Sequence, residues 1–329
     1  MRWRSLVGLG VLAAVSVGWT LRQLAPTPRA SASASAATPA PRGPVATRPL
    51  ALSTHPRVVL FAPHPDDETL GAGGVLYRLV HAGAAVQVVF MTNGDGYPRA
   101  VQEDLGVRHP TDADYIAFGE LRQREAVAAL RQLGVKRRSV RFLGFPDGGL
   151  AELWRTHWLP SHPYTSPYTK ENKPPDADTV GYDGEDLTSV IRRVLSEFRP
   201  SLVLMPHPYD THLDHAHTSY FVTEALSDLQ ATGALSSHLT VLTYLVHYPS
   251  WPATRGPSFD RAFPLGDLPD TAWTEAELTP AELDAKRAAL AEYRSQLGVM
   301  NGFLRNFLCR NELFATVDSG VLQRIASVH

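Results

Sequence analysis

Residues 58–74, VVLFAPHPDDETLGAGG, decide the fold. The stretch begins with five apolar residues in succession, a pattern typical of a parallel strand that is covered on both faces. A helix is predicted to begin near Thr69. Because ligands bind at the carboxyl edge of the strands in open α/β sheets, we expect the turn between strand and helix to lie in a binding site. The titratable residues of that turn are His64, Asp66, Asp67 and Glu68.

The turn allows two interpretations. Imidazole nitrogens and carboxylate oxygens are both good zinc ligands, and a carboxylate that does not bind the metal can take a proton from the attacking water. Half of a catalytic metal site is therefore one interpretation. The other is structural, with Asp66 or Asp67 capping the helix that follows.

Residues 201–219, SLVLMPHPYDTHLDHAHTS, repeat the same order of features. An apolar strand again runs through Pro-His-Pro into acidic residues and histidines. If a helix begins near Asp214, His212 lies at its start and His215 in its first turn, where two side chains can reach one ion. A solvated histidine-rich loop is the alternative. Two such clusters at strand ends of one sheet favour a shared site.

Together, PHPDDE (residues 63–68) and HLDH (residues 212–215) resemble the two signatures of the PIG-L/LmbE-like zinc-dependent N-acetylglucosaminyl deacetylases. The resemblance covers about residues 56–315. It implies a Zn²⁺ cofactor and hydrolysis of an N-acetyl group from an N-acetylglucosamine-type amino sugar or glycoconjugate, releasing acetate and a free amine. Other segments in the family's order are TNGDG (92–96), the R-x-x-E spacing of Arg122 and Glu125, FLGFPDG (142–148) and KRAALAEYRSQ (286–296).

The resemblance also implies catalytic roles. Asp66 would be the general base. Protonated His212, which Asp214 would orient, would stabilise the oxyanion and later protonate the amine. The implied metal ligands are His64, Asp67 and His215.

The sugar contacts implied by the resemblance are Asp95, Arg122 and Asp147. For Asp95 and Asp147 the alternative is plain turn chemistry, because each precedes a glycine. Family members often carry a tyrosine two residues before the first histidine of the second signature, where this chain has Asp210. A transition-state contact from that tyrosine is therefore in doubt in this protein.

The alternation of strands and helices over residues 56–329 predicts one α/β domain, with a Rossmann-like, mostly parallel sheet and helices on both faces. Residues 151–182 interrupt the alternation and are predicted to be an aromatic-rich insertion that faces the substrate and adds little to the core. The strands are predicted at 58–62, 85–91, 139–143, about 201–206 and 239–246, and the helices at 70–83, 113–133, 185–198, about 214–231 and 279–297.

The N-terminal residues suggest export. Residues 1–22 carry Arg2 and Arg4 before an uncharged apolar run and predict a signal anchor, or a signal peptide if cleaved. The enzyme would then be membrane-anchored and face the periplasm or exterior, or be secreted. Residues 23–55, rich in Ala, Ser and Pro, predict a disordered linker.

Composition narrows the function. A net charge of −2 with scattered Lys and Arg disfavours a nucleic-acid partner. A metal-dependent amidase acting on a non-sugar or antibiotic-like amide stays open, because the metal chemistry is indifferent to the amine side. A non-catalytic carbohydrate-binding module is disfavoured, since binding alone does not need Asp66, Asp67 and His212 together.

Overall fold

The computed structural model describes residues 48–52, 56–175, 180–235, 238–249, 251–252, 259–263 and 272–316, all within one compact unit, Gly43–His329. The predicted anchor at residues 1–22 lies outside these residues, as does the linker up to residue 47. In the described part of the chain, no helix is both long enough and apolar enough to cross a membrane.

The strands of the described residues form one mixed sheet in the order β1-β7-β8-β6-β5-β2-β3-β4. The strands from β4 to β6 in this order are all parallel, as predicted, while β8 pairs antiparallel with both β6 and β7. Their bounds are β1 Arg48–Pro49, β2 Arg57–Ala62, β3 Ala85–Thr92, β4 Val140–Phe145, β5 Leu202–Pro206, β6 Thr240–Tyr244, β7 Ala272–Glu277 and β8 Asn311–Thr316.

The strand order reverses between β2 and β5. From β2 the chain moves outward through β3 to β4, and then returns to β5 on the other side of β2 and continues to β6. The crevice at such a reversal is where ligands bind in doubly wound sheets. The two signature motifs follow these two neighbouring strands.

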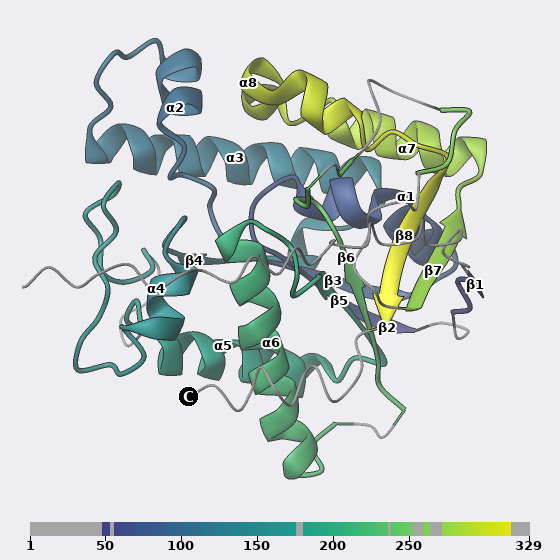
Figure 1. Cartoon of the computed structure of the whole chain (residues 1–329), viewed down its shortest axis with the longest axis horizontal. Coiled ribbons are helices and arrows are strands. Elements are labelled where there is room, and N and C mark those ends of the chain that lie inside the picture. Colours follow the sequence, from purple (N-terminus) through teal and green to yellow (C-terminus); the bar gives the residue numbers. More distant parts are fainter. Residues whose placement is uncertain are drawn as a thin grey trace, which may run out of the picture. The chain divides into compact units, whose positions relative to one another are not determined.

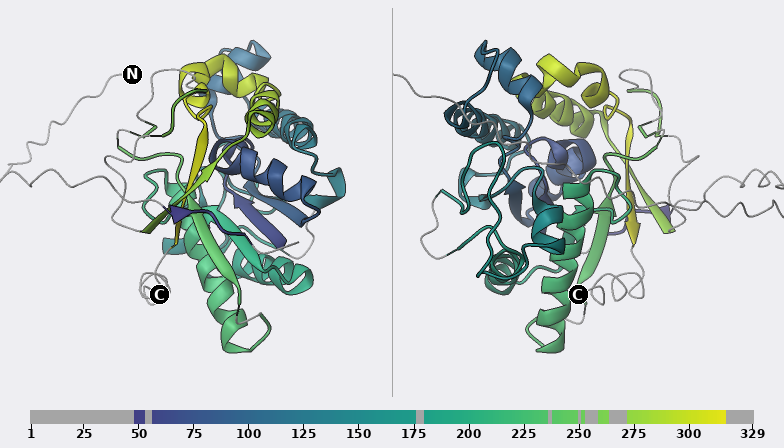
Figure 2. Two further views of the ribbon diagram at one scale, coloured as in Figure 1. Left: turned by 90° about the vertical axis from the view of Figure 1, so that its right-hand side faces the viewer. Right: turned by 60° about the vertical axis from the view of Figure 1, so that its left-hand side comes forward.

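Helices cover both faces of the sheet (Figure 1). Alternate residues of β2 serve the two layers: Val58 and Leu60 pack toward α1 and α3, whereas Val59 and Phe61 pack toward α5 and α6. Figure 2 shows the C-terminal helices beside α1 and α3. One layer holds α1 Asp67–His81, α3 Asp112–Gln132, α7 Pro280–Leu290 and α8 Arg294–Arg305, with α2 Pro98–Leu105 beside α3 and α8; the other holds α4 Leu150–Arg155, α5 Gly184–Phe198 and α6 Leu213–Ala231.

The single helix predicted at 279–297 is two helices, α7 and α8, which is a correction. Thr279 starts α7 with a capping box, and Pro280 occupies its first turn. The chain leaves helical geometry at Tyr293, whose hydroxyl donates to Glu68. The Ser295 amide then donates to Glu125 at 2.9 Å. Hydrogen bonds to distant parts of the chain thus override a locally continuous helical pattern.

The predicted role of the 151–182 insertion is largely wrong. Trp154 is 6% exposed and packs edge-on against Phe221, with ring centroids 5.0 Å apart. Trp158 and Tyr164 pack against the same apolar core. The aromatic residues were expected to face substrate, but three of the four contribute to the core. Only Tyr168 lines the cavity described below.

Residues 48–52 of the predicted linker are also ordered. Arg48–Pro49 pairs with β7, and the Leu50 amide donates to the Glu275 carbonyl at 2.9 Å. Leu50 and Leu52 pack against the apolar core. The two leucines and the pairing with β7 explain why this segment is ordered. The pairing could not be predicted because β7 lies far away in the sequence.

Helix α1 is broken at Ala72 (φ −147°), and a buried ion pair fills the break. Lys286 donates to the Leu70 carbonyl at 2.9 Å, on one side of the break. Glu312 accepts from the amides of Gly74 and Val75 on the other side, at 2.8 and 2.9 Å. Lys286 Nζ and Glu312 Oε1 lie 2.8 Å apart. The pair therefore replaces the helical hydrogen bonds that the break removes.

Replacing Lys286 with Met should lower the free energy of unfolding by about 3–5 kcal/mol, because Glu312 would stay buried without its counter-ion. Arg78→Met is the matched control, since Arg78 also joins α1 to α7, through Glu282 at 2.7 Å, but is partly exposed. The control should cost about 1 kcal/mol. Urea denaturation of both variants measures the difference, and equal losses would contradict the role given to the buried pair.

Candidate functional site

A cavity of about 340 Å³ opens at the carboxyl ends of β2 and β5, and both signature motifs line it. A larger cavity of about 680 Å³ lies beside the edge strand β4, but its lining holds no histidine. Because the histidines of the two motifs line the smaller cavity, that cavity is the candidate site.

Local backbone geometry brings the first motif into this cavity. Asp66 adopts φ 130°, in the region that favours glycine, and its amide hydrogen-bonds to Glu68 at 3.2 Å. Its carboxylate makes no capping hydrogen bond to α1, so the capping interpretation does not hold for Asp66. A strained non-glycine residue held by its neighbours is typical of functional sites.

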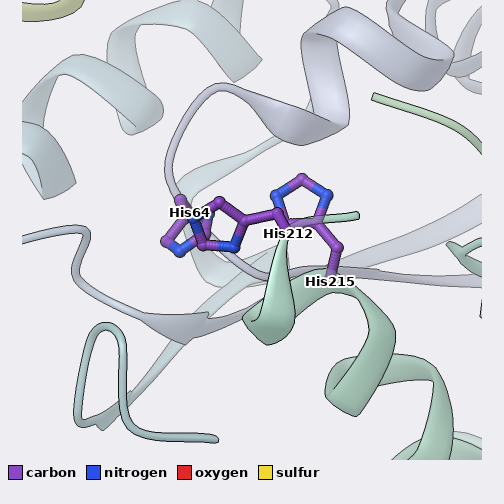
Figure 3. Close-up of side chains that lie close together, drawn as sticks. All are labelled: His64, His212 and His215. Atoms are coloured by element: carbon purple, nitrogen blue, oxygen red, sulfur yellow. The ribbon is translucent and has the colours of Figure 1, made fainter. Parts of the chain in front are cut away.

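The three predicted metal ligands meet at one carboxylate oxygen. Asp67 Oδ2 lies 3.1 Å from His64 Nδ1 and 3.2 Å from His215 Nε2. Donor atoms placed tetrahedrally at about 2.1 Å from a zinc ion are about 3.4 Å from one another. The rings of His64, His212 and His215 crowd together (Figure 3), each with a nitrogen within 4.8 Å of the others.

Two observations indicate that the donor atoms of His64, Asp67 and His215 suit a metal ion. The buried Nε2 of His215 has no hydrogen-bond partner, although it lies close to Asp67, so the two atoms approach without a bonding geometry. Burial lowers the pKa of His215, but Asp67 and Asp210 outweigh burial and raise it to about 10. The cluster therefore attracts positive charge strongly, and its nitrogen and oxygen donors suit zinc.

Each of the two predicted histidine ligands has at least one carboxylate at its second ring nitrogen. Asp210 lies 3.2 Å from His215 Nδ1 and also accepts from the amides of Val246 and His247. His64 Nε2 lies 3.0 Å from Asp147 and 3.2 Å from Asp214. Such carboxylates fix the tautomer and orientation of metal-binding histidines.

The predicted role of Asp214 needs correction. Its carboxylate accepts from the amides of Gly148 and Leu150, at 2.7 and 3.1 Å, and faces His64. Only its backbone amide contacts His212, donating to Nδ1 at 3.3 Å. The Asp214 side chain therefore orients His64, and adjacency in sequence to His212 misled the prediction.

The predicted protonated state of His212 also needs correction. Because Nδ1 accepts the Asp214 amide hydrogen, it holds no proton of its own, and the ring carries its proton on Nε2. Burial and the neighbouring His64 and His215 lower the pKa of His212 to about 4. A neutral imidazole with an Nε2–H remains a hydrogen-bond donor.

Asp66 lies beside the predicted metal ligands and pairs with Arg122. Burial raises its pKa to about 8, against the lowering effect of Arg122. Arg122 Nη2 lies 3.2 Å from Asp66 and donates to the Pro65 carbonyl at 2.5 Å, while Nη1 donates to the Gly94 carbonyl at 2.7 Å. Arg122 therefore holds Asp66, the predicted base, and the two loops around it.

The predicted sugar contacts have different outcomes. Asp147 lines the cavity, although it also contacts His64 and accepts from the Gly96 amide at 2.6 Å. Arg122 lines the cavity too, but most of its donors are engaged as above. Asp95 lies in the wall of the larger cavity instead, where burial and Asp147 raise its pKa to about 7.

Two residues of the site escaped the sequence prediction. His247 follows β6 and lines the cavity, and its ring lies 4.9 Å from that of His215. It is a polar residue directly after an apolar parallel strand, the same signal that identified His64. Gln296 of α8 also lines the cavity, 1% exposed, with Nε2 unpartnered. No strand-end signal marks a residue on a distant helix.

Comparison with known proteins gives a family and several relatives. The sequence model of the family "PIG-L: GlcNAc-PI de-N-acetylase" matches residues 59–226. A 1D-myo-inositol 2-acetamido-2-deoxy-alpha-D-glucopyranoside deacetylase of Mycolicibacterium smegmatis is 30% identical over 267 residues, 75% of this chain and 83% of that protein. A homologous enzyme of Mycobacterium sp. (strain KMS) is 31% identical over 184 residues, 55% of this chain and 54% of that protein.

Diacetylchitobiose deacetylase from Thermococcus kodakarensis is 30% identical and covers 52% of this chain and 49% of that protein. The chain thus spans about half the length of several curated relatives it matches. Among solved structures, N,N'-diacetylchitobiose deacetylase from Pyrococcus horikoshii is 19% identical, with a TM-score of 0.49 and coverage of 83% and 87%. The match of the family model to half of the chain, together with the M. smegmatis relative, shows that this protein belongs to the PIG-L (GlcNAc-PI de-N-acetylase) family.

Proposed function

We propose that this protein is a zinc-dependent N-deacetylase that hydrolyses the acetamide of an N-acetylglucosamine-type amino sugar or glycoconjugate. The observation that supports the proposal most is the carboxylate of Asp66, held at the cavity by Arg122 beside three donor atoms that meet at Asp67. A binding module needs neither a buried base nor an orphaned histidine nitrogen. The named activities of the family's relatives support the same reaction.

His64, Asp67 and His215 would hold the zinc ion. Bound zinc supplies Lewis-acid polarisation of the substrate carbonyl and makes water a better nucleophile. Asp147 and Asp214 fix His64, and Asp210 fixes His215, so that each ring presents its free nitrogen to the same point. Preorganised ligands of this kind keep one position open for chemistry.

Asp66 would take a proton from the attacking water. Its raised pKa matches this task, because a general base works best when its pKa is near the working pH. Arg122 fixes the carboxylate in place. Once protonated, Asp66 can return that proton to the amine as the C–N bond breaks.

His212 would donate its Nε2–H to the oxygen that becomes negative in the transition state. A fixed, buried donor stabilises this charge without reorganisation, and a neutral imidazole suffices. His212 would thus serve as a hydrogen-bond donor, while Asp66 would transfer the proton from the water to the amine. The sugar would lie toward Asp147 and the rings of Tyr97 and Tyr168, which offer an acceptor and aromatic faces.

The two adjacent aspartates should behave differently when replaced by Asn. Asp67→Asn removes a negative ligand, so zinc content and activity should fall together and partly recover in excess zinc. Asp66→Asn leaves the ligands in place, so it should keep about one zinc per protein, yet turn over at least ~10²-fold more slowly. Elemental analysis beside kcat measures both. If Asp66→Asn lost zinc while Asp67→Asn kept it, Asp66 would be the ligand and Asp67 the base. Full kcat in Asp66→Asn would exclude Asp66 as the base.

Asp210→Asn should weaken zinc binding about 10- to 100-fold, because Asn holds the His215 tautomer less well than a carboxylate does. Asp228→Asn is the control, since Asp228 pairs with Arg192 on the surface, at 2.8 Å, far from the cavity lining. Competition with a fluorescent zinc chelator gives the affinities. Unchanged affinity in Asp210→Asn would show that Asp210 only holds the loop after β6.

Acetate release tests the activity itself. The zinc-loaded protein should release acetate from N-acetylglucosamine, its inositol glycoside or diacetylchitobiose, and dipicolinate should abolish release until zinc is restored. Acetyl esters of the same sugars without the amide serve as the control for nonspecific hydrolysis. Release from non-sugar acetamides but from none of the sugars would assign the protein to another class of amidase.

A further inference from the structure

The lining of the cavity holds two chemically different groups of residues. One group, Tyr97, Asp147 and Tyr168, comes from the segments after β3, β4 and α4 and carries polar atoms. The other group is apolar. We name it the acyl wall, and it consists of Leu70 of α1 and of Met300, Phe303 and Leu304 of α8.

The acyl wall begins directly beside the metal-binding set. The Phe303 ring stacks on His247, with centroids 5.0 Å apart and planes at 6°. His247 in turn lies 4.9 Å from His215. Leu70 and Leu304 are buried, whereas Met300 and Phe303 are half-buried at the cavity. Large apolar side chains left open at a cavity favour an apolar ligand group.

The chemistry of an amide determines which part of the substrate meets the acyl wall. The carbonyl carbon bears the sugar nitrogen and the acyl carbon, which point in different directions. Sugar hydroxyls need polar partners, and the tyrosines and Asp147 supply them. Beside the acyl wall the polar lining residues are Gln296 and His247, and the His247 ring is stacked on Phe303. The apolar residues of α8 therefore suit the acyl group better than the sugar.

We propose that the acyl wall is a subsite for N-acyl chains longer than acetyl, of about four to six carbons, so that the enzyme is an N-deacylase of amino sugars. This inference rests on the proposed function and deepens it. The reaction is unchanged for each chain length: the C–N bond breaks, the water oxygen bonds to the carbonyl carbon, and both water protons end on the amine nitrogen. The products are a carboxylate and a protonated amine, and no other reactant is needed.

A series of N-acetyl-, N-propionyl-, N-butyryl- and N-hexanoylglucosamine, assayed for released amine, tests the proposal. Each methylene buried on the acyl wall should raise kcat/KM by about fourfold, or about 16-fold from acetyl to butyryl. Met300→Trp narrows the wall, and the butyryl-to-acetyl ratio should fall toward one. Asn301→Ala is the matched control, because Asn301 lies on the same helix, is exposed and is not part of the cavity lining. Its ratio should match the wild type.

Octyl N-acetylglucosaminide separates the acyl group from the glycosidic substituent as the occupant. If the octyl glycoside gains rate while the acyl series stays flat, the apolar wall serves the glycosidic side and the proposal is overturned. Cleavage that is fastest for acetyl and declines with length also overturns it, while leaving the proposed deacetylase function intact. Absence of cleavage for every compound, acetyl included, points instead to failure of the proposed function.

Binding of the carboxylate products gives a test that does not depend on turnover. Calorimetry on the zinc-loaded protein should show butyrate and hexanoate binding more tightly than acetate, by about fourfold per methylene. Phe303→Ala removes apolar surface from the acyl wall without blocking the cavity, so it should reduce the gain in affinity per methylene. Equal affinities for all three carboxylates would rule out an acyl subsite, including in the case that Met300→Trp does not fold.

Discussion

Buried negative charge is the constraint on which the rest of this structure depends. The carboxylates of Asp66, Asp67, Asp147, Asp210 and Asp214 are all buried near the carboxyl ends of β2 and β5. So many like charges are costly in a low-dielectric interior unless cations and amide donors compensate them. The amides of Gly96, Gly148, Leu150, Val246 and His247, the guanidinium of Arg122 and the imidazoles of His64 and His215 supply this compensation. The metal ion proposed above would add further compensating positive charge.

The central sheet and the location of the site could be predicted from sequence because the signals are local. Apolar runs mark the five parallel strands, and polar clusters directly after two of them mark the crevice at the reversal of strand order. His64, Asp67 and His215 lie where those clusters predicted. Their catalytic roles remain proposals that the geometry supports.

The errors concern properties that depend on distant partners. Closeness in sequence predicts that Asp214 orients His212, yet the Asp214 side chain turns to His64, 150 residues away. The aromatic residues of the insertion were expected at the surface because their core partners, such as Phe221, belong to another segment. Likewise, the break between α7 and α8 depends on Glu68 and Glu125, far back in the chain. A pattern of apolar residues carries no information about such pairs.

The buried pair in the break of α1 has a consequence for synthesis. A nascent chain that has emerged as far as residue 226 contains both signature motifs and all three proposed ligands. It lacks Lys286 and Glu312, which hold the two halves of α1 around its break. The contacts that hold α1 in its broken form can therefore form only once β8 has been made. A metal ion bound by His64 and Asp67, among the earliest residues of the domain to be made, would thus rest on a helix that residues near the end of the domain hold in place.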